Sequence, residues 1–130
     1  MESLILPDSN IYIGELRAGR DPFKLFDGLP DEFEFATCGM IILEVCRGIR
    51  DPHVARRIRE SFAVMVYLPT HNATWERSTQ LAWSLDRAGH VLPGPDLLIA
   101  ALALQAGATV LTHDAHFHHI PGLAVTASLR

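Results

Sequence analysis

The stretch Leu4-Ile5-Leu6-Pro7-Asp8-Ser9-Asn10-Ile11-Tyr12-Ile13 decides the fold of this chain. Its apolar start is typical of a short buried strand that runs directly into a carboxylate, and the residues after Asp8 suit a helix. In an open α/β sheet, ligands bind where strands end and helices begin, so we expect Asp8 at the mouth of a site. A lone Asp at such a junction more often caps the helix by accepting backbone N–H bonds, and both interpretations are open at this point.

Composition limits the class of protein. The chain has 130 residues, of which 48% are hydrophobic and 20% charged, and its formal net charge is −4. These values predict one globular domain over residues 1–130. No apolar run approaches the length needed to cross a bilayer, so we expect no membrane association and a cytoplasmic location. The net charge argues against a protein that coats nucleic acid non-specifically. Cys38 and Cys46 form no CxxC pair and are expected to be reduced core residues.

Alternation of apolar and turn-rich segments predicts the fold class. Strands are expected at 4–7, 34–37, 63–68, 109–112 and 123–125. Helices are expected at 9–17, 39–50 and 52–62, from Thr70 or Asn72 to Gly89, and from 93–96 to Gly107. This order indicates an α/β fold with a mainly parallel central sheet and helices on both faces. Right-handed crossovers place the carboxyl ends of the strands along one edge of the sheet.

Four carboxylates could meet at that edge. Asp8 and Asp114 each follow an apolar strand, Asp96 opens a helix that is apolar on every face, and Glu44 is the only acid in the apolar run 40–46. Asp96 could instead be a simple N-cap, and Glu44 could face water from an amphipathic helix. Four carboxylates repel one another unless they surround a hard divalent cation such as Mg²⁺ or Mn²⁺. Such an ion supports hydrolysis of a phosphodiester bond.

Basic residues and histidines are also clustered. Five of the eleven lysines and arginines are Arg47, Arg50, Arg56, Arg57 and Arg59. This cluster could follow a phosphate backbone or simply form a solvated helix face. A second cluster comprises His113, His116, His118 and His119. Its spacing matches no closed zinc site, although one of these histidines could contact an RNA phosphate.

The acids lie in four sequence contexts that together point to a family. These are Asp8-Ser9-Asn10, Leu43-Glu44-Val45 followed by Gly48, Asp96-Leu97-Leu98-Ile99-Ala100-Ala101, and Thr112-His113-Asp114 before Phe117. Nearly the whole chain resembles the PIN-domain ribonucleases, and within them the VapC-type toxins of type II toxin–antitoxin pairs. The resemblance implies a three-layer α/β/α fold and a metal-dependent endoribonuclease. It further implies that Asp8, Glu44, Asp96 and Asp114 hold one or two Mg²⁺ or Mn²⁺ ions, with Asn10 and Thr112 in support. Many relatives carry another acid where this chain has His116.

The same resemblance implies partners. They are an RNA substrate, a second copy of the chain in a homodimer, and a cognate antitoxin that blocks the cleft. We expect the antitoxin to place a basic side chain among the carboxylates, because charge-assisted bonds to carboxylates are strong. Two other functions are weighed against this one. The first is a non-catalytic RNA-binding or partner-binding domain that uses Arg47, Arg50, Arg56 and Arg57. The second is a phosphoacceptor receiver-like domain, which is disfavoured because Lys24 is the only lysine and lies early in the chain.

Overall fold

The computed structural model describes residues 3–130, so Met1 and Glu2 of the expected domain lie outside the described residues. The five strands are β1 (Ser3–Pro7), β2 (Phe33–Thr37), β3 (Val66–Tyr67), β4 (Thr109–Leu111) and β5 (Val125–Thr126). The α-helices are α1 (Ser9–Arg17), α2 (Gly39–Cys46), α3 (Pro52–Ala63), α4 (Asn72–Arg87) and α5 (Gly94–Ala106). Two short 3₁₀ helices are η1 (Pro22–Phe26) and η2 (Ala115–His119). The predicted α/β class is confirmed.

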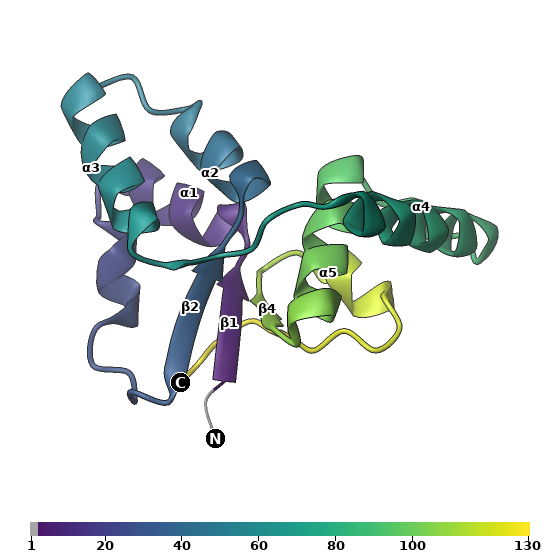
Figure 1. The fold of residues 1–130 in the computed structure, drawn as a ribbon. Helices are drawn as coiled ribbons and strands as arrows, with labels where there is room; N and C mark the ends of the chain where they lie inside the picture. The colour runs from purple at the N-terminus through teal and green to yellow at the C-terminus, as the bar shows by residue number, and fades with distance from the viewer. Residues whose placement is uncertain (1–2) are drawn as a thin grey trace.

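The strands form one sheet in the order β3-β2-β1-β4-β5, and every neighbouring pair is parallel. The chain moves outward from β1 to β3 and then crosses back to β4 on the other side of β1. Figure 1 shows α1, α2 and α3 grouped on one side of the molecule and α4 with α5 on the other. Strand order therefore reverses between β1 and β4, and ligands bind at such a switch point in open α/β sheets.

Helix α5 forms the centre of the core. Every residue from Leu97 to Ala103 is buried, as expected for a helix that is apolar on every face. Gly107 ends this helix in the left-handed region with φ 67°, a conformation that glycine adopts without strain. On the other side of the sheet, Tyr12 is fully buried against Phe23 and Phe62, with ring centroids 5.4 and 5.0 Å away. These contacts fix α1, and with it the residues that directly follow β1.

Some predicted boundaries are wrong. The third strand is only two residues long, because α3 continues to Ala63 and a turn follows in which the N–H of Met65 donates to the carbonyl of Phe62. Helix α2 stops at Cys46 rather than at 50, and β5 begins at Val125 rather than at 123. The residue that caps helix α4 is His71, rather than Thr70 or Asn72, and the N–H of His71 donates to Oγ1 of Thr74.

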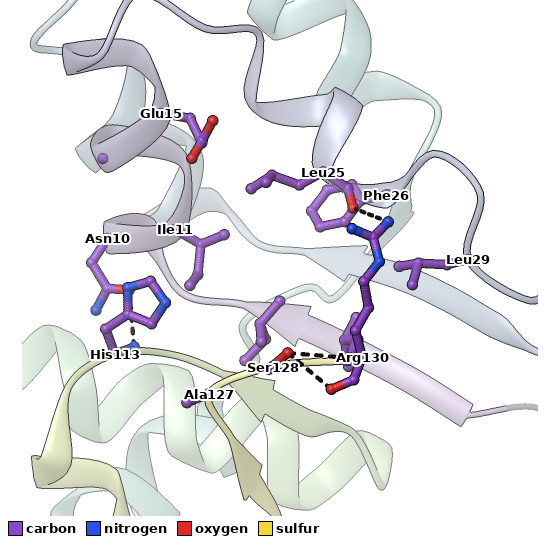
Figure 2. A pocket seen from close by; sticks show the side chains of 13 residues that line it. Asn10, Ile11, Glu15, Leu25, Phe26, Leu29, His113, Ala127, Ser128 and Arg130 are labelled. Carbon is purple, nitrogen blue, oxygen red and sulfur yellow. Dashed lines mark hydrogen bonds between the residues drawn. The ribbon is translucent and has the colours of Figure 1, made fainter.

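The C-terminal residues return to the N-terminal half of the chain. The guanidinium of Arg130 donates to the carbonyls of Leu25 and Asp27, at 3.5 and 2.9 Å. The C-terminal residues 127–130, α1 and η1 together line a cavity of about 210 Å³ that is open to solvent, and Figure 2 shows Asn10 and His113 at one end of it. Among residues 3–130, no helix is both long and apolar enough to cross a membrane.

Candidate functional site

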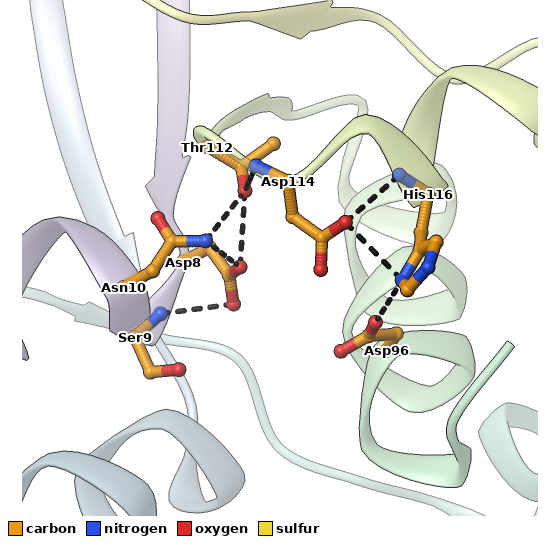
Figure 3. Close-up of polar contacts among 7 residues, drawn as sticks. All are labelled: Asp8, Ser9, Asn10, Asp96, Thr112, Asp114 and His116. Carbon is orange, nitrogen blue, oxygen red and sulfur yellow. Dashed lines mark hydrogen bonds and ion pairs between the residues drawn. The ribbon is translucent and has the colours of Figure 1, made fainter.

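Asp8 is the buried carboxylate at the centre of the site, and its side chain is only 4% exposed. It follows β1 directly and caps α1, since its Oδ1 accepts from the N–H of Ser9 at 2.9 Å. Its Oδ2 accepts from Nδ2 of Asn10 at 2.9 Å and from Oγ1 of Thr112 at 3.0 Å (Figure 3). Asp8 therefore caps α1, and it also lies at the switch point of the sheet, where a ligand site is expected.

Thr112 joins the two halves of the site. It follows β4 and is 2% exposed. Its Oγ1 donates to Asp8 and accepts from Nδ2 of Asn10 and from the N–H of Asp114, each at 3.0 Å. Asn10 makes a second contact across the switch point, because its Oδ1 accepts from the N–H of His113 at 3.3 Å. Asn10 and Thr112 thus both contact the carboxylate of Asp8 and contact each other.

Asp96 and Asp114 lie on the other side of the site. Asp96 is in the first turn of α5, and the N-cap of that helix is Pro93, so the interpretation of Asp96 as a simple N-cap is wrong. Asp114 caps η2 by accepting from the N–H of His116 at 2.9 Å. The imidazole of His116 lies between the two acids. Its Nδ1 is 3.1 Å from Oδ1 of Asp114 and 3.6 Å from Oδ2 of Asp96 (Figure 3).

Glu44 approaches the same site from α2 and is half-buried. Burial raises the pKa of its carboxyl, the charges of Asp8 and Asp96 raise it further, and a hydrogen bond with Ser9 and the charge of Arg47 oppose the rise. Glu44 thus faces water in part, since it lines an open groove, and it also lies close enough to Asp8 and Asp96 for their charges to act on its carboxyl. Among the described residues, the donor atoms that lie within 4.8 Å of one another belong to Asp96, Asp114 and His116, so neither Glu44 nor Asp8 is part of this close group.

The site carries uncompensated negative charge. Burial raises the pKa of Asp8 and of Asp96, and in each case nearby carboxylates add to the rise. Across residues 3–130, His116 is the one basic side chain in an ion pair with any of the four acids. Partly buried carboxylates that gather without a lysine or arginine fit a divalent cation, because the cation supplies the missing positive charge. Asp96, Asp114 and His116 offer donor atoms that all lie within 4.8 Å of one another.

The predicted arginines separate into two groups. Arg47 and Arg50 line an open groove of about 560 Å³ that also contains Glu44 and the apolar residues Leu16 and Val45. Arg56 and Arg57 are exposed on α3 and do not line that groove. The cluster is therefore not a single continuous surface at the site.

The histidine cluster does not form one metal site. His116 faces the carboxylates, whereas the ring of His119 stacks on His90 with centroids 3.9 Å apart. His113 lines the cavity of Figure 2, and His118 is exposed. We did not predict from the sequence that His116 lies beside both acids. The available signal was its place two residues after Asp114, because an Asp that caps a short helix holds the second residue close to its own carboxylate.

Residues 5–123 match the PIN domain, so the chain belongs to the PIN domain family, whose members are nucleases. Solved structures agree with this assignment. The crystal structure of VapBC2 from Rickettsia felis, bound to a DNA fragment from its promoter, has a similar fold. Its TM-score is 0.78 at 19% sequence identity, and the match covers 95% of this chain and 97% of that one. A toxin–antitoxin complex from Klebsiella pneumoniae has a TM-score of 0.71 at 27% sequence identity, and the match covers 94% of this chain and 95% of that one. VapC20 of Mycobacterium tuberculosis, a sarcin-ricin loop cleaving toxin, has a TM-score of 0.66 at 18% sequence identity. The match covers 88% of this chain and 92% of that one. Comparison with curated sequences yields no significant match.

Proposed function

We propose that this protein is a metal-dependent endoribonuclease and the toxin of a toxin–antitoxin pair. The observation that carries the proposal is the group formed by Asp96, Asp114 and His116, whose donor atoms lie within 4.8 Å of one another beside the switch point between β1 and β4. Thr112 links this group to Asp8, because its Oγ1 donates to Asp8 and accepts from the N–H of Asp114. Burial and the charges of Asp8 and Asp96 raise the pKa of Glu44, which faces the same site. Membership of the PIN family and the fold shared with VapBC structures support the same conclusion.

The acids would hold one or two Mg²⁺ or Mn²⁺ ions. When bound, such an ion makes its water a stronger nucleophile and stabilises charge on a phosphoryl oxygen. Thr112 and Asn10 donate to Oδ2 of Asp8 and so fix the direction in which this carboxylate presents its remaining lone pairs. Thr112 also holds the backbone of Asp114, which couples the positions of the two acids. These two residues would therefore act by positioning, as outer partners of metal ligands commonly do.

RNA would be bound partly through arginines. Arg47 and Arg50 lie in the same groove as Glu44, so an RNA backbone that contacts them would pass beside the acids. Arg56 and Arg57 would contribute a weaker attraction from the outer side of α3. RNA targets would place the protein in the cytoplasm.

We expect two protein partners. By family relationship these are a second copy of the chain and a cognate antitoxin, and two of the structures compared above are VapBC2 and a toxin–antitoxin complex. The antitoxin would insert a basic side chain among Asp8, Asp96 and Asp114, where positive charge is lacking. A complex in which these carboxylates remain open to solvent would contradict this part of the proposal.

The test is cleavage of RNA by purified protein with Mg²⁺ or Mn²⁺ and with a chelator. We expect cleavage to require the metal and to fall at least about 100-fold in Asp8→Asn and in Asp96→Asn, because each change removes a charge from the site. The matched control is Asp86→Asn, since Asp86 is exposed on α4. Cleavage that persists in either site variant would refute the proposal, and RNA binding that is indifferent to chelator, without cleavage, would favour a non-catalytic RNA-binding domain.

A further inference from the structure

The imidazole of His116 reaches into the carboxylate site. Its Nδ1 lies 3.1 Å from Asp114 and 3.6 Å from Asp96. The short helix η2 produces this geometry, because Asp114 caps it and accepts the N–H of His116. The ring is therefore held on the same side of η2 as the carboxylate that precedes it (Figure 3).

These spacings suit three ligands of one cation. Metal–ligand bonds of about 2.1 Å place neighbouring ligands of an octahedral ion about 3.0 Å apart and opposite ligands about 4.2 Å apart. The contacts of 3.1 and 3.6 Å lie in that range. The two acids are held by ordered elements, since Asp96 belongs to α5 and Asp114 is bound through its N–H to Thr112. His116 is about half exposed, at 52%, so its ring can adjust to an ion.

The donor set determines which ions bind well. Mg²⁺ takes oxygen ligands and keeps several waters, whereas imidazole nitrogen is a good ligand for transition metals. We propose that Nδ1 of His116 is a direct ligand of the cation held by Asp96 and Asp114, and that it shifts the preference of this site from Mg²⁺ toward divalent transition metals such as Mn²⁺. This inference rests on the metal site of the proposed function but not on its RNA substrate.

The histidines near His116 in the sequence offer a control for removing its imidazole. His119 is engaged with His90, and His113 lines the cavity on the other side of Asn10. His118 is exposed, and it follows His116 by two residues in the same short helix. It is therefore the matched control for removal of an imidazole.

The experiment is calorimetric titration of metal-free protein with MnCl₂ and with MgCl₂, without RNA. For the wild type and for His118→Ala, we expect binding of Mn²⁺ to exceed that of Mg²⁺ by at least about tenfold. His116→Ala should lose about tenfold in Mn²⁺ affinity, while His116→Asp should reduce the ratio of Mn²⁺ to Mg²⁺ affinity toward one. Circular dichroism checks that each variant is folded.

Pulsed electron paramagnetic resonance of bound Mn²⁺ gives a second measurement that a merely structural histidine would not affect. We expect coupling to an imidazole nitrogen in the wild type and in His118→Ala, and its loss in His116→Ala. An unchanged affinity ratio in His116→Asp, or nitrogen coupling that survives in His116→Ala, would overturn the inference. Nitrogen coupling in a protein that cleaves no RNA would refute only the proposed function, and cleavage without nitrogen coupling would refute only this inference.

Discussion

Two buried threonines at the ends of β2 and β4, the strands on either side of β1, should respond in opposite directions when each is replaced by valine. Thr112 and Thr37 are 2% and 0% exposed. The hydroxyl of Thr112 takes part in three hydrogen bonds of 3.0 Å, one of them to the carboxylate of Asp8. In the part of the chain that the structure describes, the hydroxyl of Thr37 has no hydrogen-bond partner. Valine has almost the same shape as threonine, so each exchange removes the hydroxyl and little else.

The magnitudes follow from these contacts. A hydrogen bond to a charged group contributes about 1.5–3 kcal/mol and a neutral one about 1 kcal/mol, but Asp8 and Asn10 keep other partners. We therefore expect Thr112→Val to lower the free energy of unfolding by about 2–3 kcal/mol. Burying an unpaired hydroxyl is itself costly, so Thr37→Val should raise the free energy of unfolding by about 1 kcal/mol.

Urea denaturation of both variants in the same buffer with a chelator measures the two changes. The expected difference between them, about 3–4 kcal/mol, is well above the error of the method. Each protein serves as the control for the other, since both changes are Thr→Val in buried positions at the same sheet edge. Equal stabilities, or a Thr112→Val protein that is the more stable of the two, would refute the hydrogen-bond reasoning for the site.

Three further outcomes are expected. Because burial raises the pKa of Asp8 above its ordinary 3.8, the metal-free protein should lose stability as the pH rises from about 4 toward neutrality. In thermal melts with a chelator, the melting temperature should depend less on pH for Asp8→Asn than for the wild type. An identical pH dependence in the two proteins would contradict the burial argument. Tyr12→Phe should change the free energy of unfolding by less than about 1 kcal/mol, because among residues 3–130 its hydroxyl has only a 3.9 Å contact with the sulfur of Met65. Tyr12→Ala should cost about 3–5 kcal/mol, because it removes the ring that packs against Phe23 and Phe62. Arg47→Gln should weaken RNA binding, measured by fluorescence anisotropy, more than Arg57→Gln does; equal losses would show that proximity to Glu44 is irrelevant.

Much of the site was predictable because it depends on local pattern. Asp8 and Asp114 each follow a short apolar run, and parallel topology then brings the ends of β1 and β4 together. The place of Asp96 depended on how the Pro93-Gly94-Pro95 segment enters α5, and sequence alone left the N-cap possible. Glu44 could be assigned only once α2 was oriented relative to its neighbours.

Other features depended on tertiary context that the sequence does not state. Strand β3 lies at the edge of the sheet and is short because α3 runs on to Ala63 and a turn follows, which leaves Val66 and Tyr67 to pair with β2. No residue pattern distinguishes such an edge strand from a longer one of the same composition. Likewise, residues 113–119 contain four histidines, and their spacing did not indicate which ring faces the acids, because that depends on where η2 begins.

The central pairing of β1 with β4 has a consequence for how the protein is made. Thr112 and Asp8, which share a hydrogen bond, are 104 positions apart in the chain. A ribosome must therefore synthesise most of the polypeptide before Asp8 can meet Thr112, and folding that depends on such distant contacts is slow. Incomplete translation products would lack the assembled centre, so a cell that makes this protein is exposed to the proposed cleavage activity only from nearly finished chains.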